Sequence, residues 1–230
     1  NRFRMRAAAF MNLAQQIGED NAEAGDFGFQ RLKDQGLAWV LSRQFVTFHQ
    51  LPKFKETVKL QTWHRGVEGP FYIRDYRMYA QDGTLLVESS SSWVVLNLES
   101  RAMILPQSLG LQNDADESAG KLGDSSESAA KLVAPRTVEA RLAGVRDALY
   151  SDIDYNTHVN NVRYIEWAMD VLPFEYTDTH TIKRLDINFN HEIHPGEKAE
   201  LWIREPGDGV FFIDGRIDGR QSFIIRFEFE

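Results

Sequence analysis

The 230-residue sequence contains no cysteine, which excludes disulfide bonds, thiolate metal ligands and a cysteine nucleophile. This absence fits a reducing compartment. No apolar run approaches the roughly 18 residues of a membrane-spanning helix, and the first residues contain no signal-peptide core. Positive charge is also scarce, because 26 Lys and Arg stand against 34 Asp and Glu, for a formal net charge of −8. We therefore expect no membrane segment and no broad nucleic-acid-binding surface.

Aromatic residues are plentiful: the chain has 15 Phe, 7 Tyr and 5 Trp within an ordinary apolar content of 43%. Such side chains favour β-strands and can line an apolar pocket. The length allows one or two domains. The first residue is Asn rather than Met, and we expect some N-terminal sequence, including one strand, to precede it.

The first half of the chain has the pattern of a helix followed by an antiparallel meander. A helix is predicted over residues 6–16, and Gly18 is expected to end its clean pattern. Its apolar stripe consists of Phe10, Leu13, Ala14 and Ile17. Strands are predicted at residues 38–50, 56–63, 71–79 and 84–98, with a hairpin turn at Asp82-Gly83.

Residues 107–135 differ in composition from the rest of the chain. From residue 112 to residue 131 the sequence is mainly Asp, Glu, Ser, Gly, Ala and Lys, with too few large apolar groups to offset the entropy of ordering. We interpret the segment as a mobile linker or a long surface loop, and as the domain boundary. Further strands are predicted at residues 136–145, 181–192, 197–204 and 223–229.

In the predicted strand at residues 181–192, every even-numbered position from 186 onward is polar. Side chains alternate between the two faces of a strand, so these residues share one face. We expect Asp186 and Asn188 to face solvent, and Glu192 to lie on a wet or functional face.

The two halves resemble each other. Glu56–Trp63 parallels Glu197–Arg204, and the turn Gln81–Thr84 parallels Ile217–Arg220. Similarity at this separation indicates duplication of a whole domain. A helix against an antiparallel sheet, present twice, is an α+β arrangement.

Polar side chains gather in Ser151–Asp170, ahead of a helical pattern with Val162, Ile165 and Met169 on one face. The stretch therefore predicts a polar loop leading into a helix N-terminus. Such a terminus has free N–H groups and partial positive charge, so it can hold an oxyanion. Asn and Asp are also ordinary capping and turn residues, so capping alone explains some of them.

The segment Asp154–Trp167, DYNTHVNNVRYIEW, resembles the signature of the acyl-acyl-carrier-protein (acyl-ACP) thioesterases of plant plastids and their bacterial relatives. Leu60–Trp63 and Ser92-Trp93 are also similar to that family. The resemblance implies two tandem hotdog domains, each a helix wrapped by an antiparallel β-sheet. The expected N-terminal domain, residues 1–106, shapes the acyl pocket, and the expected C-terminal domain, residues 136–230, carries catalysis.

The resemblance also implies the catalytic residues. Asp154, Asn156 and His158 match the family's D-x-N-x-H motif, and Glu192 matches a glutamate three residues after an aromatic residue. An alignment shifted by two would place Asn190 at that position. Plant members have a Cys directly after the glutamate, but this chain has Ile193, so attack by water under general-base catalysis is expected.

In the expected mechanism, Glu192 and His158 activate a water, Asn156 orients the water or the carbonyl, and Asp154 fixes Asn156 or the loop. The backbone N–H groups near the helix start are expected to face the oxyanion, at Val159, Asn160 and Asn161. The side chains of Asp152, Asn160 and Asn161 are expected to serve the cap and the loop. Tyr164 and Trp167 are expected to pack, and Glu166 is the alternative base.

The expected function is hydrolysis of fatty acyl-ACP to free fatty acid and ACP, with no cofactor and no metal. Alternatives are a hotdog acyl-CoA thioesterase, a hotdog dehydratase and a non-catalytic acyl-binding protein. The expected partner is ACP, which is acidic and would dock on a local basic patch. Candidates for that patch are either Arg2, Arg4 and Arg6, or Lys183 and Arg184. We expect a monomer or homodimer in the bacterial cytoplasm, or in the plastid stroma for a plant protein.

Overall fold

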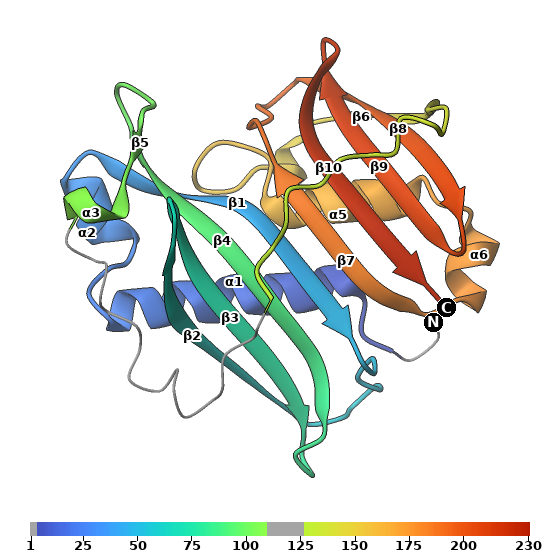
Figure 1. The fold of residues 1–230 in the computed structure, drawn as a ribbon, viewed down its shortest axis with the longest axis horizontal. Helices are drawn as coiled ribbons and strands as arrows, with labels where there is room; N and C mark the ends of the chain where they lie inside the picture. The colour runs from blue at the N-terminus through green and yellow to red at the C-terminus, as the bar shows by residue number, and fades with distance from the viewer. Residues whose placement is uncertain (1–3, 110–126) are drawn as a thin grey trace. The chain divides into compact units, whose positions relative to one another are not determined.

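The computed structural model describes residues 4–109 and 127–230. These form two compact units, one spanning Met11–Ala130 and the other combining the residues up to Phe10 with Lys131–Glu230. Each unit has an antiparallel sheet and a small number of helices (Figure 1), so the predicted α+β class is confirmed. No helix in the described ranges is long and apolar enough to cross a membrane.

The predicted helices and strands occur in the predicted order, but six further elements of the described ranges, among them the strand at Val210–Ile217, were not predicted. The first half contains α1 (Ala7–Ala24), α2 (Phe29–Asp34), β1 (Leu37–Phe48), β2 (Val58–Glu68), β3 (Phe71–Ala80), β4 (Leu85–Asn97), β5 (Met103–Ile104) and α3 (Pro106–Leu109). The second half contains β6 (Arg141–Asp147), the 3-10 helix η1 (Tyr150–Asp152), α5 (Asn161–Asp170), α6 (Phe174–Thr179), β7 (Ile182–Phe189), β8 (Lys198–Gly207), β9 (Val210–Ile217) and β10 (Arg220–Phe229). The strand predicted from residue 136 begins only at Arg141.

The strand pairing confirms the predicted duplication. In the first unit the antiparallel order is β1, β4, β3 and β2, and in the second it is β7, β10, β9 and β8. The two orders are therefore the same when the strands are counted from β1 in the first unit and from β7 in the second. The second unit adds β6 beside β8, and the first adds the short β5 beside β4.

Helix α1 continues well past Gly18, where the sequence pattern predicted its end. Gly18 is buried, and a Cβ atom placed there would lie 3.0 Å from the Tyr76 hydroxyl oxygen and 3.4 Å from Cδ of Arg74. The glycine therefore allows the helix to approach β3 closely, and it does not terminate the helix.

The apolar stripe of α1 was predicted only in part. Phe10 and Ala14 are buried, but Leu13 is 46% exposed. The buried positions of the helix recur at helical spacing through Ala7, Met11, Ala14 and Gly18. The small residues Ala7, Ala14 and Gly18 allow close packing. A prediction that relies on apolar periodicity gives such small residues little weight.

Strand β7 ends at Phe189, three residues before Glu192, so the predicted extension of this strand to residue 192 is wrong. The N–H groups of Asn190 and His191 both donate to the carbonyl oxygen of Ser222, at 2.8 and 3.0 Å. Because two successive residues share one acceptor, the regular alternation of faces stops there. The position of Glu192 is therefore determined by the loop after β7 and not by the alternation of side chains along the strand.

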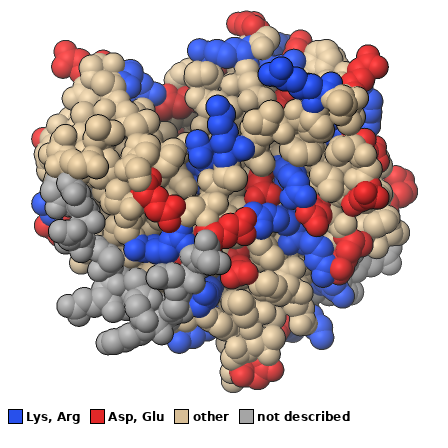
Figure 2. All heavy atoms as spheres, in the orientation of Figure 1, with Lys and Arg blue, Asp and Glu red and all other residues tan. Residues whose placement is uncertain are grey.

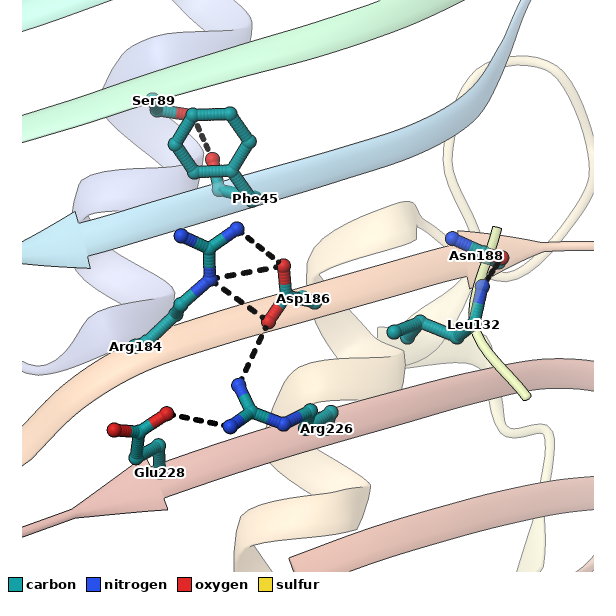
Figure 3. A network of polar contacts seen from close by, with 8 residues as sticks. All are labelled: Phe45, Ser89, Leu132, Arg184, Asp186, Asn188, Arg226 and Glu228. Carbon is teal, nitrogen blue, oxygen red and sulfur yellow. Dashed lines mark hydrogen bonds and ion pairs between the residues drawn. The ribbon is translucent and has the colours of Figure 1, made fainter. Parts of the chain in front are cut away.

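The prediction that Asp186 and Asn188 face solvent is also wrong, because they are only 7% and 4% exposed. Figure 3 shows Asp186 bound by the guanidinium groups of Arg184 and Arg226, with nitrogen–oxygen distances from 2.8 to 3.3 Å. Asn188 accepts a hydrogen bond from the Leu132 backbone N–H at 2.6 Å. These polar partners satisfy the two side chains inside the unit.

Part of the predicted linker, residues 110–126, lies outside the described residues. The described segment that follows, from residue 127, is held by hydrogen bonds at Ser128 and at Leu132. The Ser128 hydroxyl contacts Arg65 and donates to Glu68 at 2.7 Å within the first unit, and Leu132 binds Asn188 within the second. The expected domain bounds, 1–106 and 136–230, stay a prediction.

Candidate active site

The loop that precedes α5 is organised by Asp154. Its backbone N–H donates to the His158 carbonyl oxygen at 2.9 Å, and its own carbonyl accepts from the Thr157 N–H at 3.0 Å. Its side-chain Oδ1 accepts from the Asn156 N–H at 2.8 Å. Asp154 therefore holds the loop in shape, which is one of the two tasks expected for it.

Thr157 occupies the left-handed region of backbone space, with φ of 68°. This conformation is uncommon for residues other than glycine, and a β-branched residue there is strained by about 1–2 kcal/mol. The strained residue lies between Asn156 and His158, and strain of this kind gathers at functional sites.

Helix α5 begins after a side-chain cap. Asn160 is the N-cap residue, and its Oδ1 accepts a hydrogen bond from the Val162 N–H at 2.9 Å. The predicted capping role of Asn160 is therefore confirmed. Val162 and Ile165 of the predicted stripe are buried, and so are Tyr164 and Trp167, as expected.

Tyr164 joins the helix to the sheet and to the site. Its ring stacks on Phe223 of β10 with a centroid distance of 4.7 Å, and its hydroxyl oxygen accepts from the Ile193 N–H at 3.3 Å. Burial raises the pKa of the Tyr164 phenol, and the negative charges of Glu192 and Asp154 raise it further. The hydroxyl therefore stays protonated at neutral pH.

Ile193 links the two segments that carry the site. Its carbonyl accepts from the Val159 N–H at 2.9 Å, while its N–H donates to Tyr164. Ile193 is fully buried. Because Val159 follows His158 and Ile193 follows Glu192, this pairing brings the two predicted catalytic side chains side by side.

Nε2 of His158 lies 3.6 Å from Oε2 of Glu192, and the two side chains are 26% and 27% exposed. This is longer than an ordinary hydrogen bond, and catalytic contacts often tighten when substrate binds. The pair is partly accessible to water or a ligand. By contrast, the alternative Asn190 donates its side-chain amide to Gln221 at 2.9 Å.

The side chain of Asn156 has no hydrogen bond to any residue within the described ranges, and the residue is exposed. Its backbone N–H is held by Asp154. The amide is therefore free to bind a ligand or a water next to the His158 segment.

Of the three N–H groups that were expected to face the oxyanion, two already donate hydrogen bonds to backbone carbonyls in this structure. The Val159 N–H donates to Ile193, and the Asn160 N–H donates to the Asp152 carbonyl at 2.8 Å. The expectation took no account of these loop hydrogen bonds. The Asn161 N–H, at the first position of α5, has no acceptor within the described ranges, so it is the remaining donor.

Glu166, the alternative base, lies on α5 and is bound by the Arg163 guanidinium. Arg163 also lies 3.8 Å from a carboxylate oxygen of Asp152. Oε2 of Glu166 is therefore engaged in an ion pair, whereas Glu192 contacts the imidazole.

His194 was not predicted as part of the site. Its ring lies edge-on to the ring of His158, with a centroid distance of 5.5 Å and an interplanar angle of 65°. No spacing rule in the sequence connects these two histidines. Their proximity depends on the pairing of Val159 with Ile193.

Two of the candidate basic residues for partner docking, Lys183 and Arg184, are held in ion pairs. Lys183 contacts Glu230 at 2.5 Å, and Arg184 contacts Asp186 at 2.8 Å. Arg2 lies outside the described residues, whereas Arg4 and Arg6 are exposed. On the face shown in Figure 2, basic and acidic side chains are interspersed.

Comparisons with known proteins agree with both halves of the fold. A family model described as the acyl-ACP thioesterase N-terminal domain matches residues 2–105, and the corresponding C-terminal domain model matches residues 142–221. The chain is 24% identical over 205 residues to oleoyl-acyl carrier protein thioesterase 1, chloroplastic, of Arabidopsis thaliana, covering 79% of this chain and 53% of that protein. It is 26% identical over 202 residues to a palmitoyl-acyl carrier protein thioesterase, chloroplastic, of Cuphea hookeriana, covering 80% and 46%. The chain thus spans about half the length of these relatives.

Two solved structures are similar over nearly the whole chain. An acyl-ACP thioesterase from Bacteroides thetaiotaomicron superposes with a TM-score of 0.87 at 25% identity, covering 99% of this chain and 91% of that one. The 12:0-ACP thioesterase from Umbellularia californica gives a TM-score of 0.81 at 18% identity, covering 99% and 91%. Both support the tandem hotdog fold. With both domain models matched in order along the sequence, the chain belongs to the acyl-ACP thioesterase family.

Proposed function

We propose that this protein hydrolyses the thioester of fatty acyl-ACP to a free fatty acid and ACP. The observation that carries the proposal is the contact between His158 and Glu192, 3.6 Å apart, in a chain of this family. Relatives that match 79% and 80% of this chain are named as thioesterases for oleoyl- and palmitoyl-acyl carrier protein. The protein would act where ACP is present, in the bacterial cytoplasm or the plastid stroma.

In the proposed reaction, Glu192 accepts a proton from water as the water oxygen attacks the thioester carbonyl carbon. The carbonyl electrons move onto the carbonyl oxygen, and the Asn161 N–H at the helix N-terminus stabilises that oxyanion. The carbon–sulfur bond then breaks. The proton passes from Glu192 through His158 to the departing carrier thiolate, so water is divided between the acid and the thiol.

The remaining residues orient these groups. Asn156 has a free side-chain amide, which we assign to binding the water or the carbonyl. Asp154 is assigned to the loop, because it binds the backbone of both Asn156 and Thr157. A covalent cysteine route is impossible in a chain without cysteine, and the buried Ile193 follows Glu192.

The experiment is to measure release of free fatty acid from a panel of acyl-ACPs, with the matching acyl-CoAs alongside. The proposal predicts hydrolysis of acyl-ACP that depends on chain length. Hydrolysis of acyl-CoA alone would contradict ACP as the carrier. Loss of water to give an enoyl product, or binding without turnover, would contradict hydrolysis itself.

Site variants test the residues. Glu192→Gln and His158→Asn should each lower turnover by about 10²–10⁴-fold, which is the typical contribution of general acid–base catalysis. Matched controls are Glu175→Gln, at an exposed glutamate of α6, and His191→Asn, at an exposed histidine directly before Glu192. Both controls should keep wild-type turnover. Thermal unfolding of each variant establishes that it is folded.

A further inference from the structure

The imidazole of His194 lies against the imidazole of His158, although neither the D-x-N-x-H motif nor the glutamate position accounts for it. Its ring meets the His158 ring edge to face, with centroids 5.5 Å apart. Offset and edge-to-face arrangements at this separation are the favourable ones for aromatic rings. His158 thus has Glu192 at its Nε2 atom and His194 against its ring.

The turn that carries His194 is well fixed. The His194 N–H donates to Oε2 of Glu197 at 2.7 Å, and its carbonyl accepts from the Glu197 N–H at 3.1 Å. Gly196 has φ of 83°, and its N–H donates to the Ala148 carbonyl at 3.0 Å. On the other side, the backbone of Ile193 is bound to Val159. The ring therefore projects from a rigid backbone.

A rigid neighbour is relevant because the outer torsion of a histidine side chain is soft. The ring of His158 can rotate over a broad range unless something packs against it. Glu192 alone is a loose restraint at 3.6 Å. The His194 ring restricts the orientations in which Nε2 turns away from the carboxylate.

We propose that His194 is a positioning residue for this reaction, which holds the His158 ring so that Nε2 faces Glu192. Its role in turnover rests on the proposed function, whereas its hold on the His158 ring does not. Nearby charged groups are Glu192 and Asp154 at the site and Glu197 in the turn. The proposal assigns no proton transfer to His194.

The kinetic test compares His194→Ala with His194→Phe, which keeps an aromatic ring without the nitrogens. His194→Ala should lower kcat by about 3- to 10-fold, the rate equivalent of a lost aromatic pair, with KM changed less than about 2-fold. His194→Phe should restore kcat to within about 2-fold of wild type. The matched control is His191→Ala, which removes an exposed ring three residues away. Wild-type kcat in His194→Ala, or equal loss in both variants, would overturn the proposal.

The second test needs no substrate. The full chain is labelled at its 6 histidines, and the ring carbon–proton signals of His158 are assigned with His158→Gln. In His194→Ala the His158 signal should shift and broaden, because the neighbouring ring is gone and rotation is freer. In His194→Phe it should be narrow again. An unchanged His158 signal in His194→Ala would overturn the inference, whether or not the wild type has thioesterase activity. A changed His158 signal in His194→Ala, together with a wild type that lacks thioesterase activity, would refute only the proposed function.

Discussion

The Val159 N–H donates to the Ile193 carbonyl at 2.9 Å, and this hydrogen bond links the loop before α5 to the loop after β7. Each residue directly follows a proposed catalytic residue, so the bond sets the 3.6 Å contact between His158 and Glu192. The site is therefore built from two segments whose backbones pair, and its precision depends on loop hydrogen bonds.

If His158 and Glu192 act as a unit, their substitutions should not be additive. Glu192→Gln and His158→Asn should each cost about 10²–10⁴-fold in kcat, and the double variant should cost little more than the worse single variant. Turnover of the three variants on one acyl-ACP checks this. Fully multiplicative losses would mean that the residues act independently.

The Asn161 N–H is the proposed oxyanion donor, and proline can remove it without disturbing the helix. Proline suits the first helical position, and the preceding Asn160 already has extended backbone angles, with φ of −57° and ψ of 137°. Asn161→Pro should lower kcat by about 10²–10³-fold, the cost of one oxyanion donor. Asn161→Ala keeps the N–H and should retain wild-type kcat. Equal activity of the two variants would contradict the assignment.

Asparagine should adopt the left-handed backbone conformation at position 157 at a lower energetic cost than threonine does. Asn tolerates the left-handed region, so Thr157→Asn should raise the free energy of unfolding by about 0.5–1 kcal/mol. Urea unfolding measures the change. Thr137→Asn, at an exposed threonine without positive φ, is the control and should change little. A less stable Thr157→Asn protein would show that the threonine side chain makes a contact that outweighs the strain.

The pKa of Tyr164 is raised in the folded protein, mainly by burial. A group with a raised folded pKa contributes its full stability below its unfolded pKa, about 10 for tyrosine, and loses it as pH rises above that value. The wild-type free energy of unfolding should therefore fall more steeply above about pH 10 than that of Tyr164→Phe. Tyr72 and Tyr76 also have raised pKa values, so the difference between the two proteins is the quantity to measure. Parallel pH curves would contradict the prediction.

Much of the fold could be predicted, because alternation, turn residues and the repeated segments are local signals. The turn at Asp218-Gly219, for example, follows from two residues that tolerate positive φ, and both adopt it. The end of α1 could not be predicted in this way. Gly18 has the local character of a stop, but its role depends on Tyr76 of β3, which lies far away in the sequence.

The candidate site could be proposed from the sequence as a set of residues but not as a geometry. The motif indicated His158, and the spacing of three residues after Phe189 indicated Glu192. However, the alternation of β7 ends because Asn190 and His191 share the carbonyl of Ser222, which belongs to another strand. The burial of Asp186 likewise depends on Arg226, a partner distant in the chain. No sequence pattern indicated His194, because its proximity to His158 arises only from the tertiary structure.

The most direct test of the account is the initial rate of fatty acid release from acyl-ACP by wild type and Glu192→Gln, side by side. The account predicts rapid, chain-length-dependent hydrolysis by the wild type and a loss of about 10²–10⁴-fold in the folded variant. Undiminished hydrolysis by Glu192→Gln would contradict the proposed base, and no hydrolysis by the wild type would contradict the function.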